Sequence, residues 1–257
     1  MSPRACEVLK GADVIACEDT RVTGILLSQL GITGKRLIAY HEHNKAASGN
    51  GILDLLKQGL TVAQVSDAGM PAISDPGADL ASLAASNGIE VSVIPGPSAV
   101  TAALSISGLD TRYFHFEGFL PSEGSKRRER LKALTLIGET IVLYEAPHRL
   151  KKLLDELVES GFGSCRISLC RELTKKYEEV LRMTVSEAVA YYGSNEPRGE
   201  FCICLEPLEQ KTMAAGDGTA LIAMLKEKGM SSKDIAAVVS EYTGMNKKEA
   251  YKTASEL

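Results

Sequence analysis

The sequence contains no long uninterrupted run of apolar residues. A membrane-spanning helix needs roughly 20 consecutive apolar residues, and no segment approaches that length. The N-terminal segment lacks the continuous apolar core of a secretory signal peptide. With 44% hydrophobic and 24% charged residues, the composition is typical of a globular protein. We therefore expect a cytoplasmic protein that does not interact with a membrane.

Metal-binding and disulfide patterns are also missing. The six cysteines include no Cys-x-x-Cys pair, and there are only four histidines, so the sequence predicts no metal site and a reducing compartment. Cys202 and Cys204 alternate along a predicted strand and would share one face, where buried core positions are expected. His41 and His43 follow another predicted strand and fit polar loop positions better than metal ligands.

Several common catalytic and nucleotide-binding loops are absent. There is no Gly-x-Gly-x-x-Gly, no Gly-Lys-Ser/Thr of the phosphate-binding loop and no Gly-x-Ser-x-Gly nucleophile elbow. These absences exclude the most recognisable dinucleotide, nucleoside triphosphate and serine hydrolase sites. Any chemistry must therefore reside in other loops.

Strands and helices alternate in residues 1–109, which predicts a first α/β domain with an open, mostly parallel sheet. Ser2-Pro3 begins a helix, because Ser is favoured at the N-cap and Pro at the first helical position. The predicted strands of this domain are 13–17, 37–40, 61–65 and 90–94.

Residues 110–209 have the pattern of a second α/β domain with a mixed sheet, because two adjacent strands precede and follow a single helix. Its predicted strands are 113–119, 140–144, 166–170, 179–184 and 200–206. A polar linker is predicted at 211–218. The tail, 210–257, contains three predicted short helices (219–227, 232–242 and 247–256) and is either helix-turn-helix-like or a helical dimerisation cap.

Polar and glycine-rich loops follow several predicted strands. The central one is Val62–Gly77, a buried strand that ends abruptly and leads through two Asp, two Gly and two Pro residues into a helix. The carboxyl ends of parallel strands converge at one edge of a sheet, where ligands bind. We therefore expect a site in the cleft between the two α/β domains.

Seven motifs in fixed order carry a family resemblance. They are IACEDTR, VSDAGMPAISDPG, IPGPSAVTAALSISGL, FEGFLP, YEAPHR, RELTK and RGEF. Together they resemble the bacterial 16S ribosomal RNA cytidine 2′-O-methyltransferases of isoform I type, within the tetrapyrrole methylase superfamily. The resemblance implies S-adenosylmethionine between two α/β domains, a homodimer and an RNA-binding helical tail. It also implies methylation of a cytidine ribose in the decoding region of the small ribosomal subunit.

The resemblance implies a cofactor site drawn from five segments. Its residues would be Ser66, Asp67, Ala68, Gly69, Ile73, Ser74, Asp75, Pro97, Ser98, Ala99, Tyr144, Glu145, Ala146, Leu173, Gly199, Glu200 and Phe201. A general base for the ribose hydroxyl would come from Glu18, Asp19, His148 or Lys175, which the sequence does not rank.

Local clusters of basic residues predict the RNA-binding surface. The chain carries a net charge of −4, so RNA binding requires a local patch rather than a global field. The predicted RNA-binding residues are Lys126, Arg127, Arg128, Arg130, Arg149, Lys247 and Lys248.

One element of the family pattern has no counterpart in the sequence. Family members begin with a strand and a Pro-x-Gly-Asn loop before the helix that starts here at Pro3. Two alternatives therefore accompany the main hypothesis. One is an RNA-binding protein made inactive by N-terminal truncation, with weak cofactor binding and a less stable first domain. The other is a tetrapyrrole C-methyltransferase, disfavoured because that branch typically has Gly-Asp-Pro where Ser66-Asp67-Ala68-Gly69 stands here.

Overall fold

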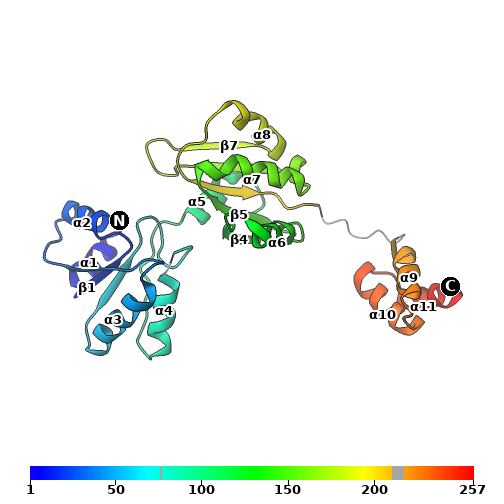
Figure 1. Ribbon diagram of the computed structural model, residues 1–257, viewed down its shortest axis with the longest axis horizontal. Coiled ribbons are helices and arrows are strands. Elements are labelled where there is room, and N and C mark those ends of the chain that lie inside the picture. The colour runs from blue at the N-terminus through cyan, green and yellow to red at the C-terminus, as the bar shows by residue number, and fades with distance from the viewer. Residues whose placement is uncertain (76, 210–216) are drawn as a thin grey trace. The chain divides into compact units, whose positions relative to one another are not determined.

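The computed structural model describes residues 1–75, 77–209 and 217–257. They form two compact units, Met1–Pro207 and Leu208–Leu257. The first contains two β-sheets with their helices, and the second contains three helices (Figure 1). The predicted linker 211–218 lies, except for its last two residues, outside the described residues.

The N-terminal half of the first unit alternates helices and strands, as the sequence predicts. Its elements are α1 (Pro3–Gly11), β1 (Val14–Cys17), α2 (Thr20–Gln29), β2 (Arg36–Ala39), α3 (Lys45–Lys57), β3 (Val62–Val65) and α4 (Gly77–Ser86). Helix α1 begins as expected: the side chain of Ser2 accepts a hydrogen bond from the Ala5 amide at 3.2 Å. This bond satisfies one of the free amides at the helix start.

The first sheet has the order β2-β1-β3 and is parallel throughout. All four residues of β1 are buried, as expected of an inner strand. The predicted strand 90–94 is wrong, because these residues pair with no other strand of the described chain. Val91 is 52% and Val93 66% exposed. This segment has the β-branched composition of a strand but lacks a neighbouring strand with which to pair.

The second half of the first unit carries the larger sheet. Its elements are α5 (Ala99–Ser107), β4 (Phe114–Phe119), α6 (Gly124–Leu134), β5 (Thr140–Glu145), α7 (Pro147–Glu159), the 3-10 helix η1 (Phe162–Ser164), β6 (Arg166–Arg171), β7 (Glu179–Thr184), α8 (Val185–Ser194) and β8 (Phe201–Leu205). The sheet order is β4-β5-β8-β6-β7. Strand β4 is parallel to β5 and the remaining pairs are antiparallel, which confirms the predicted mixed sheet.

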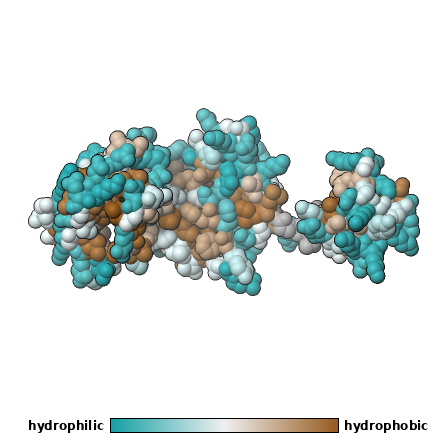
Figure 2. Space-filling view, turned by 90° about the horizontal axis from the view of Figure 1, so that it is seen from below, coloured by the Kyte–Doolittle hydropathy of each residue, from teal (hydrophilic) through white to brown (hydrophobic). Residues whose placement is uncertain are grey.

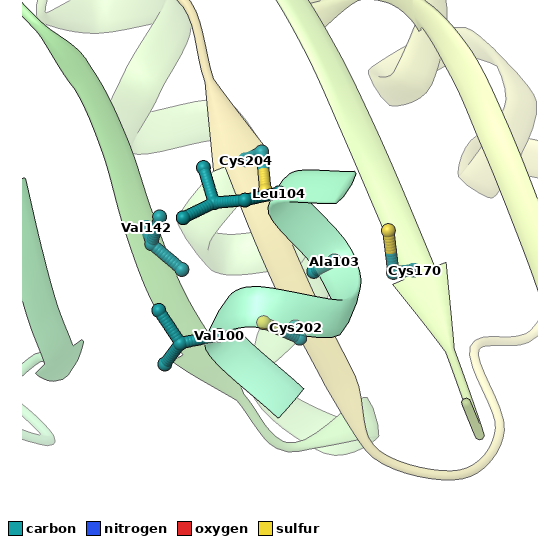
Figure 3. Close-up of a cluster of buried hydrophobic side chains, with 7 residues drawn as sticks. All are labelled: Val100, Ala103, Leu104, Val142, Cys170, Cys202 and Cys204. Carbon is teal, nitrogen blue, oxygen red and sulfur yellow. The ribbon is translucent and has the colours of Figure 1, made fainter. Parts of the chain in front are cut away.

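Helix α5 covers one face of this larger sheet. Val100, Ala103 and Leu104 of the helix pack against Val142 of β5 and three buried cysteines (Figure 3). The cysteines are Cys170 of β6 and Cys202 and Cys204 of β8, which confirms that Cys202 and Cys204 are core residues. The boundary predicted at residue 109 assigns α5 to the first domain, whereas the helix packs on the second sheet. The division of residues 1–207 into two domains therefore stays a prediction.

The second unit is a three-helix cluster with its own core. It consists of α9 (Asp217–Glu227), α10 (Ser232–Thr243) and α11 (Lys247–Glu256), close to the predicted ranges. Ile222, Ile235 and Val239 form its buried centre together with small residues of α11. Helix α10 ends at Gly244, whose φ of 69° is in the left-handed region that glycine adopts without strain.

Hydrophobic residues also reach the surface of the molecule (Figure 2). The large exposed apolar side chains of the first unit include Val91, Val93, Phe114 and Phe119. None of the described helices is long and apolar enough to cross a membrane. No three His, Cys, Asp or Glu side chains gather into a potential metal site in the described ranges.

Candidate functional site

The loop after β3 exposes much of the predicted cofactor segment. Asp67, Ala68 and Gly69 are exposed and Ser66 is half-buried. Gly69 has a φ of 78°, and a Cβ added there would lie 3.6 Å from the Pro97 carbonyl oxygen. The end of this loop therefore runs beside the segment that leads into α5. A glycine allows both the left-handed backbone and the close approach.

Asp75 organises the second part of the same loop. Its Oδ1 accepts hydrogen bonds from the amides of Ala72 (2.8 Å) and Gly77 (2.7 Å). Its Oδ2 is buried and has no hydrogen-bond partner within the described structure. Ala72 and Ser74 have φ values of 71° and 60°. Strained residues of this kind cluster at ligand-binding loops, where the surrounding structure holds them in place.

The N-terminus of α5 lies against the end of β5. Burial raises the pKa of Tyr144 to about 12, and a hydrogen bond from the Val100 amide opposes this rise. The Cys202 thiol donates to the carbonyl oxygen of Ala99 at 3.4 Å. The predicted cofactor residues Ala99 and Tyr144 therefore come together. Free amides at a helix start favour an anionic group such as a carboxylate.

Two phenylalanines of β4 surround the ring of Tyr144. The ring centroids of Phe116 and Phe119 lie 5.2 and 5.4 Å from that of Tyr144. Gly118 stands between them on the strand, and a Cβ there would lie 2.9 Å from the Ser74 hydroxyl. The loop after β3 therefore approaches β4 at a position that only glycine fits. The sequence analysis did not identify these phenylalanines as site residues, although the motif FEGFLP contains both of them.

The loop after β6 is closed by its own ion pairs. Lys175 contacts Glu172 at 2.9 Å and Glu200 at 2.8 Å. Leu173 packs beside the cluster under α5. Glu172 has a φ of 48°, and the amide of Glu200 donates to its carboxylate at 3.0 Å. Leu173 is thus near the other predicted site residues, whereas Glu200 points into an ion pair.

Three other predicted cofactor residues differ in accessibility. Gly199 is half-buried and adopts a φ of 74°, and Phe201 is buried in β8. Ile73 is exposed in the loop after β3. The buried ring of Phe201 contacts Tyr192, with a centroid distance of 6.1 Å. The side chain of Phe201 is therefore a core residue in this structure, and a contact of this position with the cofactor stays a prediction.

Glu145 is buried at the start of α7. Its side chain is 0% exposed and lies 3.1 Å from Arg149 and 3.9 Å from Arg127. Burial raises the pKa of the Glu145 carboxyl, and the Ala146 amide and the two arginines oppose this rise. Its Oε2 has no hydrogen-bond partner in the part of the chain that the structure describes. An unpaired buried carboxylate oxygen can accept a proton or a donor from a ligand.

The four candidate bases divide into two pairs. Hydrogen bonds from the side chain and backbone of Arg21 lower the pKa of Asp19 to about 2, and Asp19 caps α2. Glu200 and Glu172 raise the pKa of Lys175. A carboxylate with so low a pKa and an ammonium held by two carboxylates are poor proton acceptors near neutral pH, which disfavours Asp19 and Lys175 as the base. Glu18 and His148 are exposed and stay candidates.

Three of the predicted RNA-binding arginines hold the protein together instead. Arg127 is 2% exposed, pairs with Glu156 at 2.6 Å and donates to the Pro121 carbonyl oxygen at 2.8 Å. Arg130 donates from Nε to Glu117 at 2.7 Å. Arg149 pairs with Glu145 and donates to the Leu120 carbonyl oxygen at 2.6 Å. The burial of Arg127 contradicts its assignment to the RNA-binding surface, whereas for the partly exposed Arg130 and Arg149 an RNA contact stays a prediction.

The remaining basic residues are free to contact a ligand. Lys126 and Arg128 are exposed on α6, and Lys247 and Lys248 are exposed on α11 of the second unit. Helical periodicity explains the division on α6. Arg127 and Leu131, four residues apart, face inward, while the positions flanking Arg127 face solvent.

The fold combines a parallel and a mixed β-sheet, with a structured loop at the carboxyl end of β3. This fold matches a known class of methyltransferases. Residues 1–189 match the model of the Tetrapyrrole (Corrin/Porphyrin) Methylases. The chain therefore belongs to the tetrapyrrole methylase family.

Curated relatives and solved structures agree with this assignment. A protein of Halalkalibacterium halodurans named ribosomal RNA small subunit methyltransferase I is 49% identical over 203 residues, which are 79% of this chain and 70% of that protein. A Synechocystis protein of the same name is 40% identical and covers 100% of this chain and 93% of its own length. Diphthine synthase shares the fold at a TM-score of 0.64 and 14% identity, covering 80% of this chain and 84% of that structure.

A further solved structure was determined with a ligand. The uroporphyrin-III C-methyltransferase of Thermus thermophilus in complex with S-adenyl homocysteine has a TM-score of 0.56 and 18% identity to this chain. The match covers 80% of this chain and 90% of that structure. At this level of identity, the likeness shows the shared fold.

Proposed function

We propose that this chain transfers a methyl group from S-adenosylmethionine to the 2′-hydroxyl of a cytidine in small-subunit ribosomal RNA. The observation that carries the proposal is similarity to relatives named ribosomal RNA small subunit methyltransferase I. Those of Synechocystis and Escherichia coli O157:H7 align with 100% of this chain at 40% and 39% identity. These alignments include the helical unit as well as the two sheets.

The residues at the candidate site suit this cofactor. Exposed backbone groups at Ser66–Gly69 are available to an adenine ring and ribose hydroxyls. The free amides at the start of α5 suit the amino-acid carboxylate, and the unpaired oxygen of Asp75 can accept a hydrogen bond. When bound, S-adenosylmethionine supplies an electrophilic methyl group on sulfur and becomes S-adenosylhomocysteine.

The chain's own contribution is positioning and removal of one proton. An in-line displacement needs the acceptor oxygen close to the methyl carbon and aligned with the breaking bond. The O–CH₃ bond forms as the S–CH₃ bond breaks, and the hydroxyl proton passes to a base. Glu18, which directly follows β1, and His148, the second residue of α7, are the candidate acceptors with accessible side chains.

Methyl transfer to unmethylated small ribosomal subunits tests the proposal. We expect incorporation of labelled methyl from S-adenosylmethionine at one cytidine, where 2′-O-methylation makes the RNA backbone resistant to alkaline hydrolysis. A parallel reaction with a porphyrinogen should give no product. Methylation of the porphyrinogen but not of the ribosomal subunit would replace this proposal with the tetrapyrrole C-methyltransferase alternative.

We also propose that the protein acts as a homodimer that binds RNA through Lys126, Arg128, Lys247 and Lys248. Each phosphate contact steepens the decrease of affinity with salt. Changing Lys126 and Arg128 to Glu should weaken RNA binding and reduce this salt dependence, without a matching change in cofactor affinity. Light scattering that gives a single 27.5 kDa chain at micromolar concentration would contradict the dimer.

A further inference from the structure

Strand β4 contains a bulge that changes the direction of its last side chains. Its register with β5 pairs Phe116 with Val142 and then Gly118 with Leu143, so one extra residue, Glu117, stands between these pairs. In a regular strand, Phe116 and Phe119 would point to opposite faces, because they are three residues apart and side chains alternate along a strand. With it, both rings lie on the face of Tyr144. Bulges often re-aim a side chain beside an active site.

Buried and ordered contacts hold the bulge in place. The carboxylate of Glu117 is 5% exposed and accepts from Arg130 of α6 and from His115 Nε2 at 2.9 Å. A single carboxylate therefore ties the extra residue to a helix and to its own strand. Bidentate arginine–carboxylate pairs fix geometry more strictly than single hydrogen bonds.

The chain is held equally firmly just after Phe119. Arg149 donates to the Leu120 carbonyl oxygen at 2.6 Å, and Arg127 donates to that of Pro121 at 2.8 Å. Three arginines therefore position the short segment 117–121. The side chain they position is that of Phe119, which nevertheless stays 52% exposed. An apolar ring that is held in place and half exposed is available to stack on a ligand.

The surroundings of the three rings indicate which ligand covers Phe119. Phe116 and Tyr144 pack against the cluster under α5, beside the predicted cofactor segments, and are only partly exposed. Phe119 is the most exposed of the three rings. Helix α6 begins five residues further on and presents Lys126 and Arg128 to solvent. An exposed aromatic ring followed closely in the sequence by exposed cations suits an unpaired RNA base, whose ring stacks while its phosphates meet the cations.

We propose that Phe119, supported by Tyr144, stacks on the pyrimidine ring of the target nucleotide and so positions its ribose for methylation. This inference rests on the proposed function. Stacking on an aromatic side chain is tolerant of base identity, so Phe119 contributes position and affinity rather than recognition of cytosine. Arg127, Arg130 and Arg149 are positioning residues in this account, because they hold the segment that carries the ring.

Steady-state methylation of small ribosomal subunits by Phe119 variants is the first test. Phe119→Ala should raise KM for the subunit about 10-fold, the size expected for losing one base–aromatic stack. Phe119→Tyr keeps a ring and should stay within about 2-fold of the parent. The dissociation constant for S-adenosylmethionine should be unchanged in both. Phe114→Leu, at the opposite end of the same strand and also exposed, is the matched control and should behave like the parent.

Tryptophan fluorescence provides a second test that needs no turnover. The sequence contains no tryptophan, so Phe119→Trp introduces a single reporter at the proposed contact. A short single-stranded cytidine RNA should quench its emission, whereas S-adenosylhomocysteine alone should not. Phe114→Trp should respond to neither ligand. Circular dichroism of each variant would verify that the fold is retained.

The outcomes separate this inference from the proposed function. Failure of the parent chain to methylate any ribosomal particle would remove the proposed function, while the fluorescence titration would still report on the stack. Quenching by S-adenosylhomocysteine alone would show that the ring serves the cofactor's adenine and would overturn the inference. An active parent enzyme with unchanged KM in Phe119→Ala would overturn it as well.

Discussion

The two sheets of the first unit differ in how completely they are enclosed. In the larger sheet, α5 covers one face, and the alternate residues Ile141, Leu143 and Ile203 on the other face are 0% exposed. In the smaller sheet only β1 is buried along its whole length, while β2 and β3 are partly exposed. Strand β3 pairs with β1 alone in the described structure, and the apolar segment 90–94 beside α4 pairs with nothing.

This difference has consequences for both stability and binding. Backbone groups on an unpaired strand edge must be satisfied by water or by another strand. The loop after β3, which carries seven of the 17 predicted cofactor residues, therefore begins at the less enclosed sheet. Tyr144 and the phenylalanines next to it belong to the larger sheet, whose three inner strands are mostly buried. The candidate site thus combines residues of the well-packed larger sheet with a loop that follows the partly exposed strand β3.

The largest effect should come from the buried ion network of the larger sheet. Replacing Arg127 by Leu leaves the carboxylate of Glu156 without its partner and leaves Glu145 with Arg149 alone. Breaking a buried pair in this way costs about 3–5 kcal/mol. Urea denaturation followed by circular dichroism would measure the change in unfolding free energy. Arg128→Leu, its exposed neighbour, should change it by less than about 0.5 kcal/mol. Equal effects of the two changes would contradict the structural role of Arg127.

Truncating one apolar side chain in each sheet region should show the difference in packing. Ile203→Ala removes a fully buried side chain from central strand β8 and should destabilise the protein by about 2–5 kcal/mol. Val93→Ala changes a side chain that is 66% exposed and should cost less than about 0.5 kcal/mol. Thermal unfolding of both variants would measure this. A comparable loss in Val93→Ala would show that segment 90–94 is packed in solution.

Most elements of this fold follow from the sequence, and the exceptions have physical reasons. The three tail helices were predicted at 219–227, 232–242 and 247–256, close to their bounds in the structure, since capping residues such as Ser231 and Gly244 mark their ends. The segment 90–94 was predicted as a strand because its residues favour one. Strand formation also needs a partner, which residue preferences do not reveal.

The candidate site was only partly predictable. Loops at strand ends pointed to Ser66–Gly69 and Tyr144, because topology brings such loops together. The role of Arg127 was misjudged, since a run of basic residues does not tell which of them turns inward. Phe119 was missed because the bulge in β4 changes the face of the sheet to which its side chain points. The amino-acid composition of a strand does not predict a bulge.

Adding a strand that pairs with the free edge of β3 is the most direct way to make the smaller sheet as enclosed as the larger one. A version of the chain with an added apolar N-terminal strand should slow amide exchange of β3 by about 10-fold or more, since each new backbone hydrogen bond contributes roughly 1 kcal/mol. Cofactor affinity should rise as well, because the loop after β3 becomes better supported. The same extension with proline within the strand cannot complete the ladder and serves as the control. Equal cofactor affinity and turnover with and without the strand would show that the open edge is irrelevant to the site.

The smallest expected effect is a dependence of stability on pH. It comes from two carboxylates of the larger sheet, Glu145 and Glu117, whose pKa values are shifted in opposite directions. Burial raises the pKa of Glu145 above its ordinary value of 4.5. The folded state therefore binds this proton more tightly than the unfolded state, and stability falls as pH rises from about 4.5 to the raised pKa. Glu145→Gln should lose this dependence. Urea denaturation between pH 4 and 8 would measure the unfolding free energies of parent and variant. Their difference should change between pH 4.5 and the raised pKa of Glu145, and it should be constant at higher pH.

Glu117 provides the control with the opposite sign. Burial alone would raise its pKa, but hydrogen bonds from Arg130 and His115 outweigh burial and lower it below 4.5. Its contribution to stability is therefore present above the ordinary pKa and is lost as pH falls through the lowered value. The unfolding free energies of Glu117→Gln and the parent should approach each other toward acid pH. Toward acid pH the parent should become more stable relative to Glu145→Gln. The same sign in both variants would mean that the Glu117 carboxylate is not held by Arg130 in solution. The bulge that positions Phe119 would then lack its main support.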